Sequence, residues 1–158
     1  EPVMEKLIRR IDLRHTKRED IRRQLGEEWL VTNGLGGYAS GTISGAVSWR
    51  YHGLLIAALP SPLGRVVMLN HLAESLRLPD GRLIEFCGHE TNPRDRVISC
   101  GQFLAEFRLE NQMPIWRYEL ENIALEKILV LLHGQNTVHI TYRLLAGPGK
   151  RRAPTSSQ

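Results

Sequence analysis

Residues 103–110 carry the sequence FLAEFRLE, in which apolar and charged side chains alternate. The same alternation recurs in IWRYELE (115–121) and TVHITYRL (137–144). A period of two is typical of half-buried antiparallel strands, which place one face on a core and the other in solvent. The three segments therefore predict an antiparallel sheet.

Short turn sequences lie between the expected strands. LPDGR (78–82) predicts a hairpin, and EN (121–122) and HGQN (133–136) link two further pairs of strands. Long strands joined by short turns leave almost no helix after Gly26, so we expect a mainly β fold, an antiparallel β-sandwich.

The N-terminal segment follows a different period. Apolar residues recur at helical spacing from Met4 to Ile11, and Gly26 is a suitable helix end, so a helix is predicted over residues 4–25. The expected organisation is an N-terminal helical extension (1–26), a β-sandwich domain (27–146) and a disordered tail (147–158).

Composition and charge exclude several classes of protein. The 158 residues, 42% of them hydrophobic, suit one globular domain with a real core. No apolar run is long enough to span a bilayer and no signal-peptide core is present, so a soluble, cytoplasmic protein without membrane contact is expected. The net charge of +4 lies mostly in the tail, which holds Lys150, Arg151 and Arg152. Because other basic residues interleave with acidic ones, nucleic-acid binding is not expected.

The cysteines and histidines do not form a recognisable ligand set. Cys87 and Cys100 lack the spacing of a zinc site or a redox pair. They are interpreted as two unpaired thiols, and neither a metal nor another cofactor is predicted.

Six glycines lie within EWLVTNGLGGYASGTISGAVSWRYHGLL (28–55). GLGGYA (34–39) formally matches the dinucleotide-binding pattern, but β-branched residues rather than a helix follow it, and no acidic residue lies about twenty residues on. Two interpretations stay open. The glycines form bulges and tight bends, or they accompany a sugar site that uses Arg50, Tyr51 and His52 of SWRYHG (48–53).

Three blocks of the sequence resemble a known family. EWLVTNGLGGYASGT, followed by RYHGLL and PLGRVVML, is similar to the N-terminal domain of the bacterial and archaeal type of glycogen debranching enzyme, the amylo-α-1,6-glucosidase family. LEKILVLLHGQNTVHITYRLL resembles the family's next block. The resemblance implies a β-supersandwich followed by an (α/α)-barrel that carries the catalytic carboxylates. We expect the sandwich to be incomplete and the barrel to be absent from this chain, as in a fragment or a truncated protein.

No catalytic residue is assigned within the chain. Glu106, Glu110, Glu119 and Glu121 fall on the polar faces of strands and are interpreted as solvated surface charges. Three other glutamates flank turns or loops without an evident partner. These are Glu74, Glu85 and Glu90.

The resemblance implies a non-catalytic N-terminal domain of a glycoside hydrolase that packs on the catalytic barrel and helps shape the glucan cleft. Asn33, Arg50, Tyr51 and His52 are the hypothesised cleft or domain-interface residues. The expected partners are the barrel and glycogen or another α-glucan.

Two alternatives remain open. One is an autonomous α-glucan-binding module that uses Trp49, Tyr51, Trp116 and Tyr118, although the last two are expected in the core. The other is a structural or assembly domain with an exposed edge strand.

Overall fold

The computed structural model describes residues 7–46, 49–86 and 99–147 of the chain. The five-stranded sheet has the order β1 (Leu7–Asp12), β8 (Leu104–Glu110), β9 (Met113–Leu120), β10 (Ile123–Leu131) and β11 (Val138–Ala146). The four-stranded sheet consists of β2 (Glu28–Thr32), β3 (Tyr38–Thr42), β4 (Gly53–Leu59) and β5 (Gly64–Leu69). A separate hairpin pairs β6 (Ser75–Arg77) with β7 (Leu83–Glu85). The helical elements include η1 (Leu13–His15) and α1 (Arg18–Leu25).

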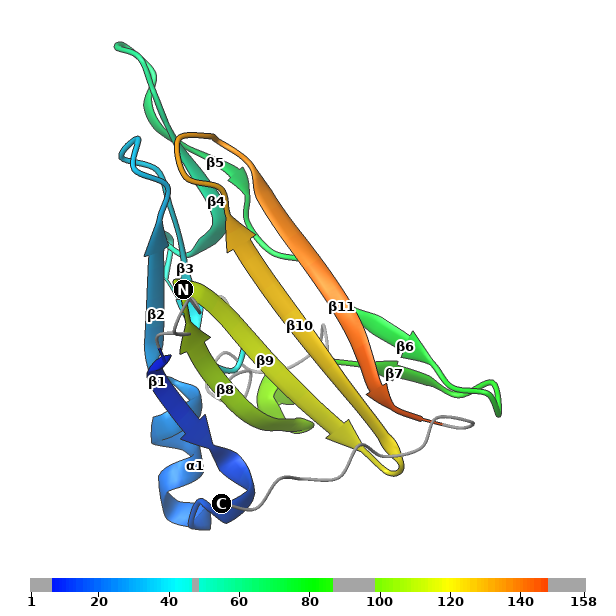
Figure 1. Cartoon of the computed structure of the whole chain (residues 1–158). Helices are drawn as coiled ribbons and strands as arrows, with labels where there is room; N and C mark the ends of the chain where they lie inside the picture. Colours follow the sequence, from blue (N-terminus) through cyan, green and yellow to red (C-terminus); the bar gives the residue numbers. More distant parts are fainter. Residues whose placement is uncertain (1–6, 47–48, 87–98, 148–158) are drawn as a thin grey trace, which may run out of the picture.

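All strand pairs are antiparallel, and the two larger sheets form the layers of a sandwich. Figure 1 shows the five-stranded sheet in front of the four-stranded one, with α1 beside the end of β1 and the start of β2. The predicted β-sandwich is confirmed. The turns predicted at 78–82, 121–122 and 133–136 also lie where expected, between β6 and β7, β9 and β10, and β10 and β11.

The predicted helix over residues 4–25 is only partly right. Residues Arg18–Leu25 are helical, but Leu7–Asp12 form β1, which pairs with the edge of β8. In a strand Ile11 packs against the core, while Arg10 on the other face donates to Glu106. Pairing with the free edge of β8 thus outweighs the helical spacing of apolar residues in this segment. Contacts with a neighbouring strand determine whether such a segment becomes a strand or a helix.

The core centres on two tryptophans from opposite sheets. Trp29 of β2 and Trp116 of β9 meet edge to face with ring centroids 5.4 Å apart, and Phe107 of β8 packs at the same distance from Trp116. Each indole N–H donates to a backbone carbonyl at the end of β3 or directly after it: Trp29 to Thr42 at 3.2 Å and Trp116 to Ile43 at 2.9 Å. The large rings are therefore buried without an unsatisfied donor.

A row of charges crosses the outer face of the five-stranded sheet. Neighbouring strands pair these residues in register: Asp12, Glu106, Arg117, Glu126 and Arg143. The expectation of a solvated charge is wrong for Glu106, which is buried, as is Glu126. Arg108 lies between the two, with Nη1 3.3 Å from Glu106 Oε1 and 3.0 Å from Glu126 Oε1. We call these six residues, the five in register and Arg108, the charge ladder.

The charge ladder determines how the sandwich responds to acid. Burial alone raises the pKa of Glu126, but hydrogen bonds from Arg143 and Arg108 outweigh it and hold the pKa below its ordinary value of 4.5. A carboxyl group whose pKa is lower in the folded state stabilises the fold above its unfolded-state pKa. That stabilisation is lost as the pH falls through the folded-state pKa.

We expect the free energy of unfolding to decline as the pH falls below about 5 and the decline to be shallower in Glu126→Gln. At pH 7 this variant should lose about 1–3 kcal/mol, because Arg108 and Arg143 lose a charged partner. Urea unfolding at several pH values measures both effects. The control Glu121→Gln removes an exposed carboxylate and should follow the wild type; equal pH profiles for all three proteins would contradict the role of Glu126.

Candidate functional site

In the described part of the chain, one hollow lies on each side of the four-stranded sheet. The inner cavity, of about 360 Å³, lies between the sheets and is lined by residues that include Trp29, Thr42, His71, Glu74, Trp116 and Lys127. The outer groove, of about 510 Å³, lies on the opposite face of β2 and β3. It is lined chiefly by Glu28, Leu30, Thr32, Tyr38, Tyr51 and Arg65. Strand alternation produces this division, since Trp29 and Val31 point inward while Glu28, Leu30 and Thr32 point outward.

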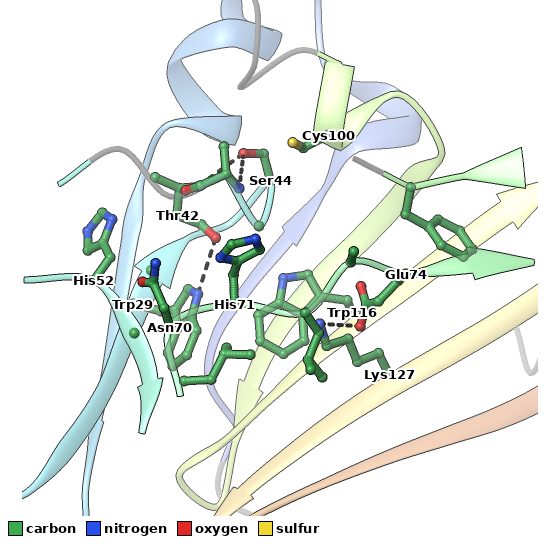
Figure 2. Close-up of a pocket in the computed structure, with 18 of the residues that line it drawn as sticks. Trp29, Thr42, Ser44, His52, Asn70, His71, Glu74, Cys100, Trp116 and Lys127 are labelled. Carbon is green, nitrogen blue, oxygen red and sulfur yellow. Dashed lines mark hydrogen bonds and ion pairs between the residues drawn. The ribbon is translucent and has the colours of Figure 1, made fainter. Parts of the chain in front are cut away.

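An ion pair occupies one end of the inner cavity. Lys127 Nζ of β10 lies 2.6 Å from Glu74 Oε1, in the segment between β5 and β6, and both side chains are largely buried. The same ammonium group lies 5.2 Å from the ring centroid of Trp116, a cation–π contact. Figure 2 shows this pair at the far end of the cavity from His52. Sequence reasoning saw no partner for Glu74, because its partners lie on strands far along the chain.

Glu74 also accepts a hydrogen bond from the hydroxyl of Tyr142 on β11. Burial, with a smaller effect from the Glu74 carboxylate, raises the pKa of Tyr142. The pKa of Tyr118, fully enclosed nearby, is raised mainly by burial and then by the charge of Glu74. Both phenols therefore stay protonated at neutral pH, and Tyr142 serves as a hydrogen-bond donor to Glu74. The segment carrying Glu74 is fastened to the five-stranded sheet.

Cys100, which also lines the inner cavity, is disulfide-bonded. The expectation of two unpaired thiols is therefore wrong; the other cysteine, Cys87, lies outside the described residues. Sequence spacing missed the bond because pairing depends on which cysteines the fold brings together. Disulfides persist mainly in oxidising compartments, and the cytoplasmic location remains a prediction.

Two side chains meet at Glu28 beside the outer groove. The Tyr51 hydroxyl donates to Glu28 Oε1 at 3.1 Å, and His52 Nε2 lies 3.1 Å from the same oxygen. The Tyr51 ring stands edge to face against the buried His52 ring, with centroids 4.9 Å apart. Partial burial and the Glu28 carboxylate raise the pKa of Tyr51, so its hydroxyl remains a donor at neutral pH.

Tyr38 and Arg65 form the other wall of the outer groove. Tyr38 donates its hydroxyl to the backbone oxygen of Tyr51 at 3.1 Å, which ties β3 to the segment before β4. The Arg65 guanidinium lies 6.0 Å from the Tyr38 ring centroid and donates Nε–H to the Gly36 carbonyl at 3.1 Å. The groove therefore combines aromatic rings with charged groups of both signs.

Asn33 builds the turn at the end of the outer groove. Its Oδ1 accepts from the backbone N–H of Leu35 at 2.9 Å and of Gly37 at 3.0 Å. Its Nδ2 donates to Gln135 and Asn136 of the β10–β11 turn. Asn33 is fully buried, and a Cβ atom on Gly37 would lie 2.7 Å from its Nδ2 and 2.9 Å from the Ile56 carbonyl. Close backbone packing thus accounts for Gly37.

The structure brings two of the four hypothesised site residues together. Tyr51 and His52 share Glu28, whereas Asn33 lies in the turn that supplies Gly36 and Gly37 to the groove. Arg50 is exposed beside Tyr51. Sequence reasoning missed three groove residues. These are Glu28, Tyr38 and Arg65.

Only the first of the three missed residues carried a sequence signal. Glu28 opens the alternating segment EWLVT, which places it on the outer face with Leu30. Tyr38 and Arg65 come from β3 and β5, and only the register of the sheet brings them beside Tyr51. Within the described ranges no group of three or more His, Cys, Asp or Glu side chains is placed to hold a metal ion. Nor does a helix in this part of the chain have the length and apolarity to cross a bilayer.

Comparison with known protein families gives a match over most of the chain. Residues 27–154 match the family model described as glycogen debranching enzyme N terminal. No curated protein and no solved structure gives a significant match to the chain.

Gly37→Ala should lower the free energy of unfolding by about 1–3 kcal/mol, because the added methyl group displaces Asn33 or the Ile56 carbonyl. Gly26→Ala is the matched control. A Cβ there would meet its nearest backbone oxygen at 3.4 Å, so its effect should stay within about 0.5 kcal/mol. Urea unfolding measures both variants, and equal stabilities would show that the turn tolerates a side chain at Gly37.

A double-mutant cycle with Glu74→Gln and Lys127→Met should give a coupling free energy of about 1–3 kcal/mol, because the pair is shielded from water. The exposed pair Arg82–Glu121, 2.9 Å apart, is the control and should couple by less than about 1 kcal/mol. Thermal or urea unfolding supplies the four stabilities of each cycle. Equal coupling in both cycles would contradict a fastening role for the buried pair.

Proposed function

Because the chain belongs to the glycogen debranching enzyme N-terminal family, with residues 27–154 matched, we propose that it is a non-catalytic domain of a debranching α-1,6-glucosidase. In this role it packs on the catalytic (α/α)-barrel of the parent glycoside hydrolase. It also helps shape the cleft that receives the branches of glycogen or a related α-glucan.

The observation that carries the non-catalytic role is the number of carboxylates in the hollows. Among the residues described as lining them, the inner cavity contains Glu74 alone and the outer groove Glu28 alone. Glycoside hydrolysis requires two carboxyl groups facing one bond, about 5–5.5 Å apart for retention and about 6.5–9.5 Å for inversion. Each glutamate is moreover engaged, Glu74 by Lys127 and Tyr142 and Glu28 by Tyr51 and His52.

A strip of the five-stranded sheet supports packing on another domain. The inward-facing residues of β11 continue the core side of the sheet, yet Tyr142 and Leu144 are 46% and 43% exposed. The four-stranded sheet leaves this strip uncovered, and an apolar sheet face of this kind gains free energy when a partner covers it. The proposal assigns this uncovered face of β11 to the barrel.

The outer groove is proposed as part of the rim of the glucan cleft. Tyr51 lines its wall, His52 is buried behind Tyr51 against Glu28, and Asn33 shapes the turn at its end. Arg50 is exposed next to Tyr51 in the chain. In the assembled enzyme these residues would orient the glucan, while the barrel supplies both catalytic carboxylates.

The test combines the purified chain with a separately purified (α/α)-barrel domain from a member of the family. We expect no glucose release from a branched limit dextrin by the chain alone, and release by the barrel that rises when the chain is added. Leu144→Ser should raise the chain concentration needed for half-maximal stimulation by about tenfold, because it weakens the apolar contact. Leu63→Ser, which changes an exposed leucine before β5, is the control and should behave as wild type.

Three outcomes would contradict the proposal. The first is full barrel activity without the chain. The second is hydrolysis by the chain alone that Glu28→Gln or Glu74→Gln abolishes. The third is a dimer in sedimentation that Leu144→Ser dissociates, which would assign the uncovered face of β11 to a second copy of the chain.

A further inference from the structure

Two exposed aromatic rings stack on each other beside the outer groove. The rings of Trp49 and Tyr51 are parallel, with 4° between their planes and centroids 6.2 Å apart. They are 57% and 47% exposed, although large aromatic side chains are usually buried on folding. We call the pair the aromatic platform.

Tyr51, one of the two rings of the aromatic platform, is held in place by several contacts. Tyr51 is held by its hydroxyl at Glu28, by its backbone oxygen at Tyr38 and by ring contact with His52. His52 is buried and cannot shift without disturbing the sheet. A preordered aromatic surface loses little conformational entropy on binding, which favours recognition over random exposure.

The outer groove next to the platform offers hydrogen-bonding groups of both kinds. Glu28 supplies acceptor oxygens, and Arg65 has used only its Nε–H among the contacts with the described residues, leaving its other N–H groups as donors. The volume of about 510 Å³ is within the range of small-molecule sites.

The charged side chains that line the outer groove indicate which chemical class of ligand it can bind. Its charged residues are one glutamate and one arginine, so it has no excess positive charge for a phosphate or a nucleic acid. A neutral polyhydroxylated chain fits better, because its hydroxyl groups can both donate and accept while its C–H faces lie on aromatic rings. Among such ligands, membership of the debranching family favours α-1,4-linked glucose.

We propose that the aromatic platform and the outer groove form a binding site for a linear α-1,4-glucan segment. A sugar ring packs on the exposed side of the Trp49–Tyr51 stack, and hydroxyl groups of the chain bond to Arg65 and Glu28. The choice of glucan rests on the proposed function, whereas the site rests on the geometry. The site holds substrate without cleaving it, and it lets the isolated chain bind glucan.

Tryptophan fluorescence tests the proposal on the chain itself, with maltoheptaose as the probe. Trp29 and Trp116 are 4% and 2% exposed, so acrylamide quenches mainly Trp49. We expect maltoheptaose to protect this fluorescence in a saturable manner. Trp49→Ala should raise the dissociation constant, measured by calorimetry, by about tenfold or more, and Trp49→Phe should restore most of the affinity.

Two controls distinguish binding at this site from non-specific binding. Met68→Ala removes an equally exposed apolar side chain from β5 and should bind as wild type. Cellohexaose, whose glucose units are β-1,4-linked, should bind at least about tenfold more weakly than maltoheptaose. Equal binding of the two sugars, or no effect of Trp49→Ala on maltoheptaose binding, would overturn the proposal. So would an absence of binding by folded wild-type chain.

Failure of this site and failure of the proposed function give different results. If Trp49 stays unprotected while the chain still stimulates the barrel, only the glucan site is wrong. If maltoheptaose binds through Trp49 while the barrel ignores the chain, the domain role is wrong and an α-glucan-binding module remains.

Discussion

The contact between Trp29 and Trp116 is the interaction on which the rest of the molecule depends. It joins the two sheets at the centre of the core, and its indole N–H groups hold the carbonyls of Thr42 and Ile43. Those two bonds fix the chain where it leaves β3, and the same segment lines the inner cavity. Since Trp29 points inward, its neighbours Glu28 and Leu30 must point outward. The outer groove therefore follows from the orientation of one core residue.

The fold was predictable wherever one face of a strand is buried. Trp116 and Tyr118 alternate with Arg117 and Glu119, and burial of the first pair confirms the pattern. The strand β1 was not predicted, because its position depends on pairing with the free edge of β8. The spacing of apolar residues within the segment carries no information about that edge. The disulfide at Cys100 was missed for a similar reason. Such features depend on contacts between residues distant in sequence.

The candidate site was predictable only in part. Tyr51 and His52 stand in one short motif beside flexible backbone, so composition indicated them. Their common partner Glu28 precedes them by more than twenty residues, and Arg65 reaches the same groove from β5. Asn33 was singled out from the same glycine-rich region, and the structure gives it a turn to organise. Sheet register, rather than sequence proximity, assembles the groove.

The charge ladder has a consequence for how the strands find their partners. Side chains alternate with a period of two, so a slip of one residue would turn Glu106 or Glu126 into the sandwich core. A carboxylate there would lose its arginine partners and face Trp29 of the opposite sheet, at a large cost in free energy. The ladder therefore adds more to the choice of pairing than to stability, since solvent-shielded ion pairs recover little beyond their own dehydration. Misaligned strand pairings are disfavoured because they would bury a carboxylate that has no arginine partner.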